Sequence, residues 1–171
     1  MQEDGFRGGR RRLAVVLAVT MVVGASAVSQ AAPSRGGRAS GGMPVAAHAR
    51  LTLRSSEYGK VIFDAHGRVL YLFAADHSAK STCYGVCAAA WPPMLTKGAP
   101  TAGPGLNAKL VGTTKRRDGS LQVTYNGHPL YYYSADMRGK IMCQHANMHG
   151  GFWFVVKANG TPNTAKSKSK M

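Results

Sequence analysis

The side chains with the most reactive chemistry lie in one short segment, residues 142–149, which reads Met-Cys-Gln-His-Ala-Asn-Met-His. Thiolate, imidazole and thioether groups are soft or borderline metal ligands, and this combination suits copper. The candidate ligands are Cys143, His145, Met148 and His149. Their spacing matches no complete copper-binding motif. We therefore expect no cofactor and favour a polar loop with one core methionine, with copper binding as the alternative hypothesis.

A second pattern, Tyr-x-aromatic-x-x-Asp, occurs twice. Its residues are Tyr71, Phe73 and Asp76 in the first copy and Tyr131, Tyr133 and Asp136 in the second. In an extended strand the two aromatic positions point to one face, and the residues between them point to the other. A carboxylate just after a strand can accept backbone N–H bonds and fix a turn. We predict this structural role for both aspartates. The alternative is a pair of acids that meet and serve acid–base chemistry or cation binding.

The two motifs belong to a longer internal repeat with an offset of 60 residues. Residues 67–76 align with residues 127–136, and the register continues to Cys83 and Cys143. Seven of the 17 aligned positions from Gly67 to Cys83 are identical, where chance would give about one. The sequence therefore predicts a duplicated structural unit.

Three cysteines are present: Cys83, Cys87 and Cys143. A disulfide between Cys83 and Cys87 is the default pairing for an exported chain, although the loop that it closes is tight. The repeat register offers a bridge between Cys83 and Cys143 as an alternative. Thiol–disulfide exchange is a weaker hypothesis, because the usual redox motif has two residues between its cysteines rather than three.

The sequence contains no recognisable catalytic motif. It has no Gly-x-Ser-x-Gly turn, no His-Glu-x-x-His helix, no phosphate-binding loop and no dinucleotide fingerprint. Cys143 and His145 could form a nucleophile pair, but no orienting acid accompanies them. The residues favour a non-catalytic domain over an enzyme, and we assign no catalytic residue.

The first 31 residues have the order of a secretory signal. Four arginines precede an apolar run from Leu13 to Val28, and small residues follow it. We place cleavage after Ala31, with Ala27 as the second choice, and keep a retained membrane anchor as the alternative. No cysteine lies near the cleavage site, so lipid attachment there is not expected. No transmembrane segment is expected after cleavage.

The remaining chain divides into three parts. Residues 32–47 form a flexible Gly/Ser/Arg linker, residues 48–160 a β domain, and residues 161–171 a disordered basic tail. We predict a mostly β fold with two pseudo-repeated antiparallel hairpin or meander units on one core, at about 50–100 and 110–160. Strands are expected at 60–63, 69–73, 111–116, 121–125 and 152–156. One short helix is expected near 83–90, capped by Ser81 or Thr82 and stopped by the prolines after Trp91.

The chain is strongly basic, with 22 Lys and Arg against 7 Asp and Glu and a formal charge of +15. Such a chain is attracted to polyanions. Export makes a specific nucleic-acid partner unexpected, so the candidate partners are anionic envelope components or a membrane surface.

The motifs together resemble a bacterial family of secreted repeat lipoproteins that carry Tyr-x-aromatic-x-x-Asp. The resemblance rests on both motifs and on the segments 83–88, 91–93, 125–131 and 150–153. It covers roughly residues 48–160 and implies an exported, envelope-associated protein of uncharacterised biochemical function. The chain departs from that family in lacking the lipidation cysteine.

The leading interpretation is a secreted or cell-envelope domain with a non-catalytic binding or structural role. The alternative is a copper-binding or thiol-redox envelope protein that uses the cysteines and the Met/His segment.

Overall fold

The computed structural model describes residues 48–166, so the predicted signal peptide and front linker lie outside the described residues. The described part is mostly β, with one short α-helix, α1, and one 3-10 turn, η1, which confirms the predicted fold class. In chain order the elements are β1 (Arg50–Ser56), β2 (Gly59–Asp64), β3 (Tyr71–Phe73), α1 (Val86–Ala90), β4 (Leu95–Thr96), β5 (Thr101–Ala102), η1 (Ala108–Leu110), β6 (Val111–Lys115), β7 (Leu121–Tyr125), β8 (His128–Pro129), β9 (Ala146–Met148) and β10 (Gly151–Val155).

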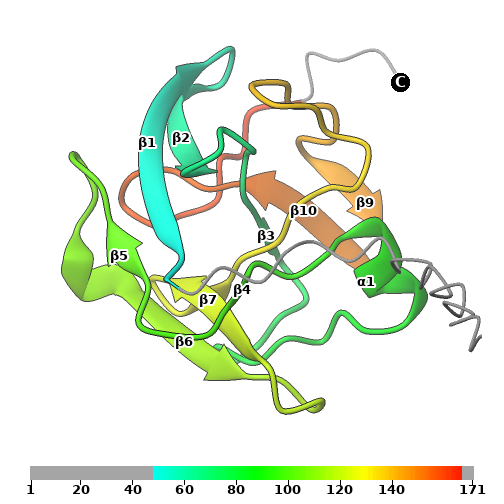
Figure 1. The fold of residues 1–171 in the computed structure, drawn as a ribbon. Helices are drawn as coiled ribbons and strands as arrows, with labels where there is room; N and C mark the ends of the chain where they lie inside the picture. The colour runs from blue at the N-terminus through cyan, green and yellow to red at the C-terminus, as the bar shows by residue number, and fades with distance from the viewer. Residues whose placement is uncertain (1–47, 167–171) are drawn as a thin grey trace, which may run out of the picture. The chain divides into compact units, whose positions relative to one another are not determined.

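The strands form three small sheets, ordered β2-β1-β5, β3-β10-β9 and β4-β7-β6, with β8 paired to β7 (Figure 1). All pairings between named strands are antiparallel except the parallel pair of β1 and β5. The β3-β10-β9 sheet joins distant parts of the chain, because β3 from the first repeat pairs with β10 near the C-terminal end.

The two repeats meet at their motif tyrosines. The N–H of Tyr71 donates to the carbonyl of Tyr131, and the N–H of Tyr131 donates back to the carbonyl of Tyr71, both at 2.9 Å. Such a mutual pair is what a local two-fold axis between equivalent residues produces. The turns that follow also match, since Asp76 N–H bonds to Phe73 O and Asp136 N–H to Tyr133 O, each at 3.1 Å.

Each motif segment, β3 in the first repeat and residues 131–134 outside any named strand in the second, bonds to the closing segment of the other repeat. In the first direction, Ala74 N–H donates to Phe152 O at 2.8 Å. In the second, Ser134 N–H donates to Ala90 O at 2.9 Å. The repeats are therefore interlocked rather than placed side by side, and neither completes its own pairing.

The alternation along the motif strands sorts their side chains into two buried clusters, as expected from strand geometry. Tyr71 and Phe73 lie in one cluster, which also contains Trp91 and Trp153. The leucines at 70 and 72, and Leu130 from the second repeat, lie in the other cluster.

The aromatic cluster follows the same local symmetry. The rings of Trp91 and Trp153 stack with centroids 3.9 Å apart and an angle of 5° between their planes. Trp91 meets Tyr71 edge-on at 5.1 Å, and Trp153 meets Tyr131 edge-on at 5.2 Å. Both indoles are fully buried. Stacked and edge-on rings add to the free energy gained from burying their area.

The helix is shorter than predicted. It begins at Val86 rather than at Cys83, and Gly85 precedes it with a φ of 56° and no side-chain cap. Both predicted capping residues are bound elsewhere. The Thr82 hydroxyl donates to Asp76, and Ser81 contacts Arg116 and Tyr131.

The strands β1, β4, β5 and β9 were not expected from the sequence. β2 pairs along its whole length with β1, so the predicted hairpin between 60–63 and 69–73 is reduced to a bridge at Phe63 and Val69. β9 pairs with β10 within the segment interpreted as a polar loop.

The domain also continues past residue 160, where the tail was expected to begin. The Asn163 side chain donates to Tyr58 O at 2.8 Å, and its N–H donates to Val155 O at 2.9 Å. Residues 167–171 of the predicted tail lie outside the described residues.

Because the stacked indoles hold the two repeats together, Trp153→Ala should lower the free energy of unfolding by about 3–5 kcal/mol. Phe152→Ala is the matched control on the same strand, since Phe152 is 40% exposed, and it should cost about 1 kcal/mol or less. Urea unfolding followed by circular dichroism measures both. Equal losses for the two variants would contradict the assigned core.

Candidate functional site

The two motifs exchange their polar partners across the local axis. The Tyr71 hydroxyl donates to Asp136 Oδ2 at 2.7 Å, and the Tyr131 hydroxyl donates to Asp76 Oδ2 at 2.6 Å. Each motif's tyrosine therefore binds the other motif's aspartate. No hydrogen bond joins the two carboxylates to each other in the described residues.

The second oxygen of each carboxylate fixes a loop of its own repeat. Asp76 Oδ1 accepts from the backbone N–H of Thr82 at 2.7 Å and from its hydroxyl at 2.8 Å. Asp136 Oδ1 accepts from Met142 N–H at 2.9 Å. Thr82 and Met142 are themselves equivalent in the repeat register. Each carboxylate thus holds a loop on one side and the opposite repeat on the other.

Burial dominates the electrostatics of these pairs. It raises the pKa of Asp76 and of Asp136 above the ordinary aspartate value, although the tyrosine hydroxyls and backbone N–H groups oppose the shift. Burial, together with the neighbouring carboxylate, also raises the pKa of Tyr71 and Tyr131 far above the tyrosine range. The phenols therefore remain protonated donors. Each carboxylate is thus held on both oxygens, by a phenol of the other repeat and by the loop of its own.

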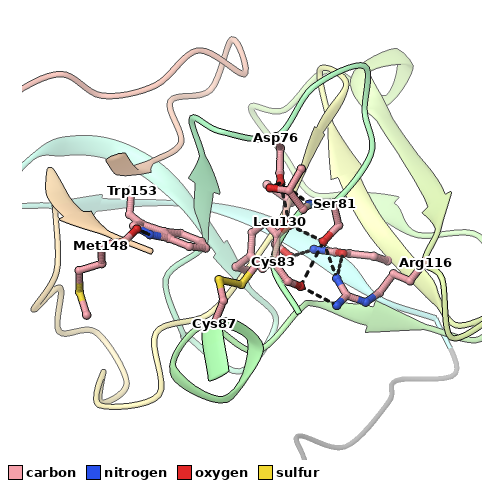
Figure 2. Close-up of a disulfide and its surroundings, with 11 residues drawn as sticks. Asp76, Ser81, Cys83, Cys87, Arg116, Leu130, Met148 and Trp153 are labelled. Atoms are coloured by element: carbon pink, nitrogen blue, oxygen red, sulfur yellow. Dashed lines mark hydrogen bonds between the residues drawn. A yellow bond between two sulfur atoms is a disulfide. The ribbon is translucent and has the colours of Figure 1, made fainter. Parts of the chain in front are cut away.

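The first repeat carries a disulfide between Cys83 and Cys87, beside a buried arginine (Figure 2). Arg116 is only 5% exposed. Its Nη2 donates to the carbonyl of Cys83 at 2.8 Å, and its Nη1 donates to Ser81 Oγ at 2.7 Å. Nη1 also donates to Gln122 Oε1 at 2.6 Å.

This arginine network connects the disulfide loop to the crossed motif pairs. The Tyr131 hydroxyl, which binds Asp76, also lies 2.7 Å from Ser81 Oγ. The Gln122 side chain in turn donates to Leu130 O at 2.8 Å. Sequence reasoning missed Arg116, Ser81 and Gln122, because no local pattern places a strand-end arginine of one repeat against a loop of the other.

Cys143, equivalent to Cys83, is buried and unpaired, so the alternative cross-repeat bridge is not formed. Burial raises the pKa of its thiol, while the Tyr133 hydroxyl acts in the opposite direction. A thiol in such surroundings is a poor nucleophile at neutral pH.

The other candidate metal ligands are spread over a β-hairpin. The His145 ring packs on Phe152 and Phe154 at 5.2 Å from each. Met148 is partly buried in β9, and His149 is exposed in the turn that follows. Within residues 48–166 no three His, Cys, Asp or Glu side chains are grouped as a metal site. Copper binding stays a hypothesis.

Comparison with known proteins gives one family. The family model described as a secreted repeat of unknown function matches the chain twice, at residues 52–94 and 112–157. The two matches coincide with the two interlocked repeats. No curated protein and no solved structure matches the chain.

Removing either motif hydroxyl should destabilise the fold to a similar degree, because each leaves a buried carboxylate oxygen without its donor. We expect Tyr71→Phe and Tyr131→Phe each to lower the free energy of unfolding by about 1–3 kcal/mol. The control is Tyr84→Phe, since the Tyr84 hydroxyl accepts a solvent-exposed hydrogen bond from the backbone N–H of Arg117. That change should stay within about 0.5 kcal/mol. A loss for only one motif tyrosine would show that the crossed pairs are not equivalent.

The raised carboxyl pKa values predict a pH dependence. A group with a raised folded pKa contributes stability that is fully present below its unfolded pKa and is lost as pH rises through the folded one. Wild type should therefore lose stability relative to Asp136→Asn as pH rises from about 4 towards neutral. Urea unfolding at stepped pH values measures this difference.

Asp118 provides a control of opposite sign. Hydrogen bonds from Ser120 lower the pKa of its exposed carboxyl. Its contribution is present above the unfolded pKa and is lost as pH falls through the folded one. As pH rises from acidic values to about 4, wild type should therefore gain stability relative to Asp118→Asn. The same sign for both variants would refute the assigned environments.

Proposed function

Because the chain belongs to the family of secreted repeats of unknown function whose model matches both halves of its domain, we propose that it is a non-catalytic binding module of the cell envelope. Its partners in this proposal are anionic envelope components. The observation that carries the proposal is that exposed cations greatly outnumber exposed carboxylates on its described surface.

The surface charge is one-sided over the described residues. The exposed carboxylates are Glu57 and Asp118. The exposed cations are Arg50, Arg54, Lys60, Lys80, Lys97, Lys109, Lys115, Arg117, Arg138, Lys140 and Lys166. The other carboxylates, Asp64, Asp76 and Asp136, lie inside hydrogen-bond networks. Such a surface attracts anionic polymers and anionic headgroups over about a Debye length.

The interior supports a binding role rather than catalysis. Each motif carboxylate is held by a tyrosine of the other repeat and by the backbone of its own, so these groups maintain the fold. Buried acids in this arrangement stabilise a frame, on which binding residues can be displayed.

The location fits anionic envelope partners. The family is secreted, and a disulfide such as Cys83–Cys87 persists in oxidising compartments outside the cytoplasm. Over residues 48–166, every helix is too short or too polar to cross a membrane.

The proposal is tested by co-sedimentation with a polyglycerol phosphate polymer and with anionic or neutral phospholipid vesicles. Binding to the polymer and to the anionic vesicles should fall steeply between about 50 and 500 mM salt, because ions screen exposed charges. Neutral vesicles should bind little.

The matched variants separate charge from side-chain shape. Replacing Lys97, Lys109 and Lys115 by glutamine removes three exposed charges and should weaken binding several-fold. Replacement of the same lysines by arginine keeps the charge and should leave binding within about twofold. Binding that changes neither with salt concentration nor with the loss of the three lysine charges would refute the proposal.

A further inference from the structure

A cavity of about 340 Å³ opens at the side of the domain, lined by residues from both repeats. The turn after β2, the start of β1 and the segment before β4 contribute to it from the first repeat. The second repeat contributes Tyr132 and Arg138. The volume is at the lower end of the range for small-molecule sites.

Three of the residues that line the cavity, Asp64, Arg68 and Tyr132, interact with one another. Asp64 Oδ1 accepts from the N–H groups of His66 and Arg68 at 2.9 and 2.8 Å, and the Tyr132 hydroxyl lies 3.2 Å from Asp64 Oδ2. The Arg68 guanidinium lies 4.7 Å from the centroid of the Tyr132 ring and donates to Tyr133 O at 3.0 Å. The one carboxylate of the cavity is therefore occupied, and Arg68 is held in place.

The mouth of the cavity carries cations without partners. Arg50 and Arg138 line it and are exposed, and their guanidinium groups form no hydrogen bond or ion pair within the described range. His48 and His66 lie beside them. With Arg68, three guanidinium groups and one carboxylate line the space, so its lining side chains carry a net positive charge.

The two turns that carry these residues are tied to each other. Gly139 N–H, next to Arg138, donates to Gly67 O at 2.8 Å. Gly67 has a φ of +83°, a conformation that favours glycine over residues with a side chain. The separation of the turns is thus set by the backbone before any ligand binds, which lowers the entropic cost of binding.

The geometry points to a binding site for a small organic anion: a phosphate monoester or carboxylate held by Arg50 and Arg138, with its apolar part on Met94 and Tyr132. Paired guanidinium groups bind such oxyanions in bidentate fashion. The inference rests on the proposed binding role and names the site and the ligand chemistry. The anion can be a free metabolite or the acidic group of an envelope polymer.

The test uses the secreted protein, with phenyl phosphate, benzoate and inorganic phosphate as probes in isothermal titration calorimetry. We expect one equivalent of phenyl phosphate or benzoate to bind, and inorganic phosphate to bind more weakly because it lacks the apolar part. Arg50→Gln and Arg138→Gln should each reduce the affinity by about tenfold or more. Lys60→Gln, which removes an exposed charge at the opposite end of the β1–β2 hairpin from the cavity, should leave it unchanged. Failure of both organic probes to bind, or equal binding by all variants, would overturn the site.

A competition arm distinguishes the two sources of the anion and the two proposals. If phenyl phosphate displaces the polyglycerol phosphate polymer from wild type, the site takes the acidic group of a polymer. If it binds while the polymer stays bound, the ligand is a free anion. Either result supports the site. Polymer adhesion without binding of the organic probes keeps the proposed function and refutes the site. Probe binding without salt-sensitive adhesion keeps the site and refutes the wider role.

Discussion

The crossed exchange between the motifs is the constraint from which the rest of the domain follows. Tyr71 and Tyr131 share two backbone hydrogen bonds, and each hydroxyl binds the aspartate of the other repeat. This fixes the local axis, and the axis brings Trp91 against Trp153. It also places each motif segment within hydrogen-bond distance of the closing segment of the other repeat. A single repeat would expose an unpaired strand and leave one buried acid without a donor, so both copies are needed for one core.

The symmetry is retained at the centre and lost at the periphery. Cys83 is disulfide-bonded, while its equivalent Cys143 is a buried thiol. The Trp153 indole N–H donates to Met148 O at 3.0 Å, whereas that of Trp91 has no partner in the described range. The first turn is also one residue longer, because Val69 pairs with Phe63, whereas its equivalent Pro129 pairs with Thr124 rather than with residue 123. Residues of the longer turn line the cavity.

Local features of the fold could be predicted from the sequence, and long-range ones could not. The Asn126-Gly127 turn and the strands around it were found because a turn of positive φ and an alternating strand are local signals. The sorting of Tyr71 and Leu70 into separate cores follows from the same alternation. The crossed pairing and the Arg116 network depend on which distant segments meet. Ser81 and Thr82 were wrongly expected to cap a helix because the tertiary partners of their hydroxyls are invisible in sequence.

The position of the cations follows from this division between a fixed centre and a variable periphery. A buried charge is costly unless it is hydrogen-bonded. Asp64, Asp76 and Asp136 meet this requirement by accepting hydrogen bonds from backbone N–H groups. Arg116 is the buried cation that this interior accommodates, since its guanidinium finds three acceptors. The other unbonded cations must face solvent. Over the described residues these cations greatly outnumber the exposed carboxylates Glu57 and Asp118, which is the physical reason to look for the function of this domain at its surface.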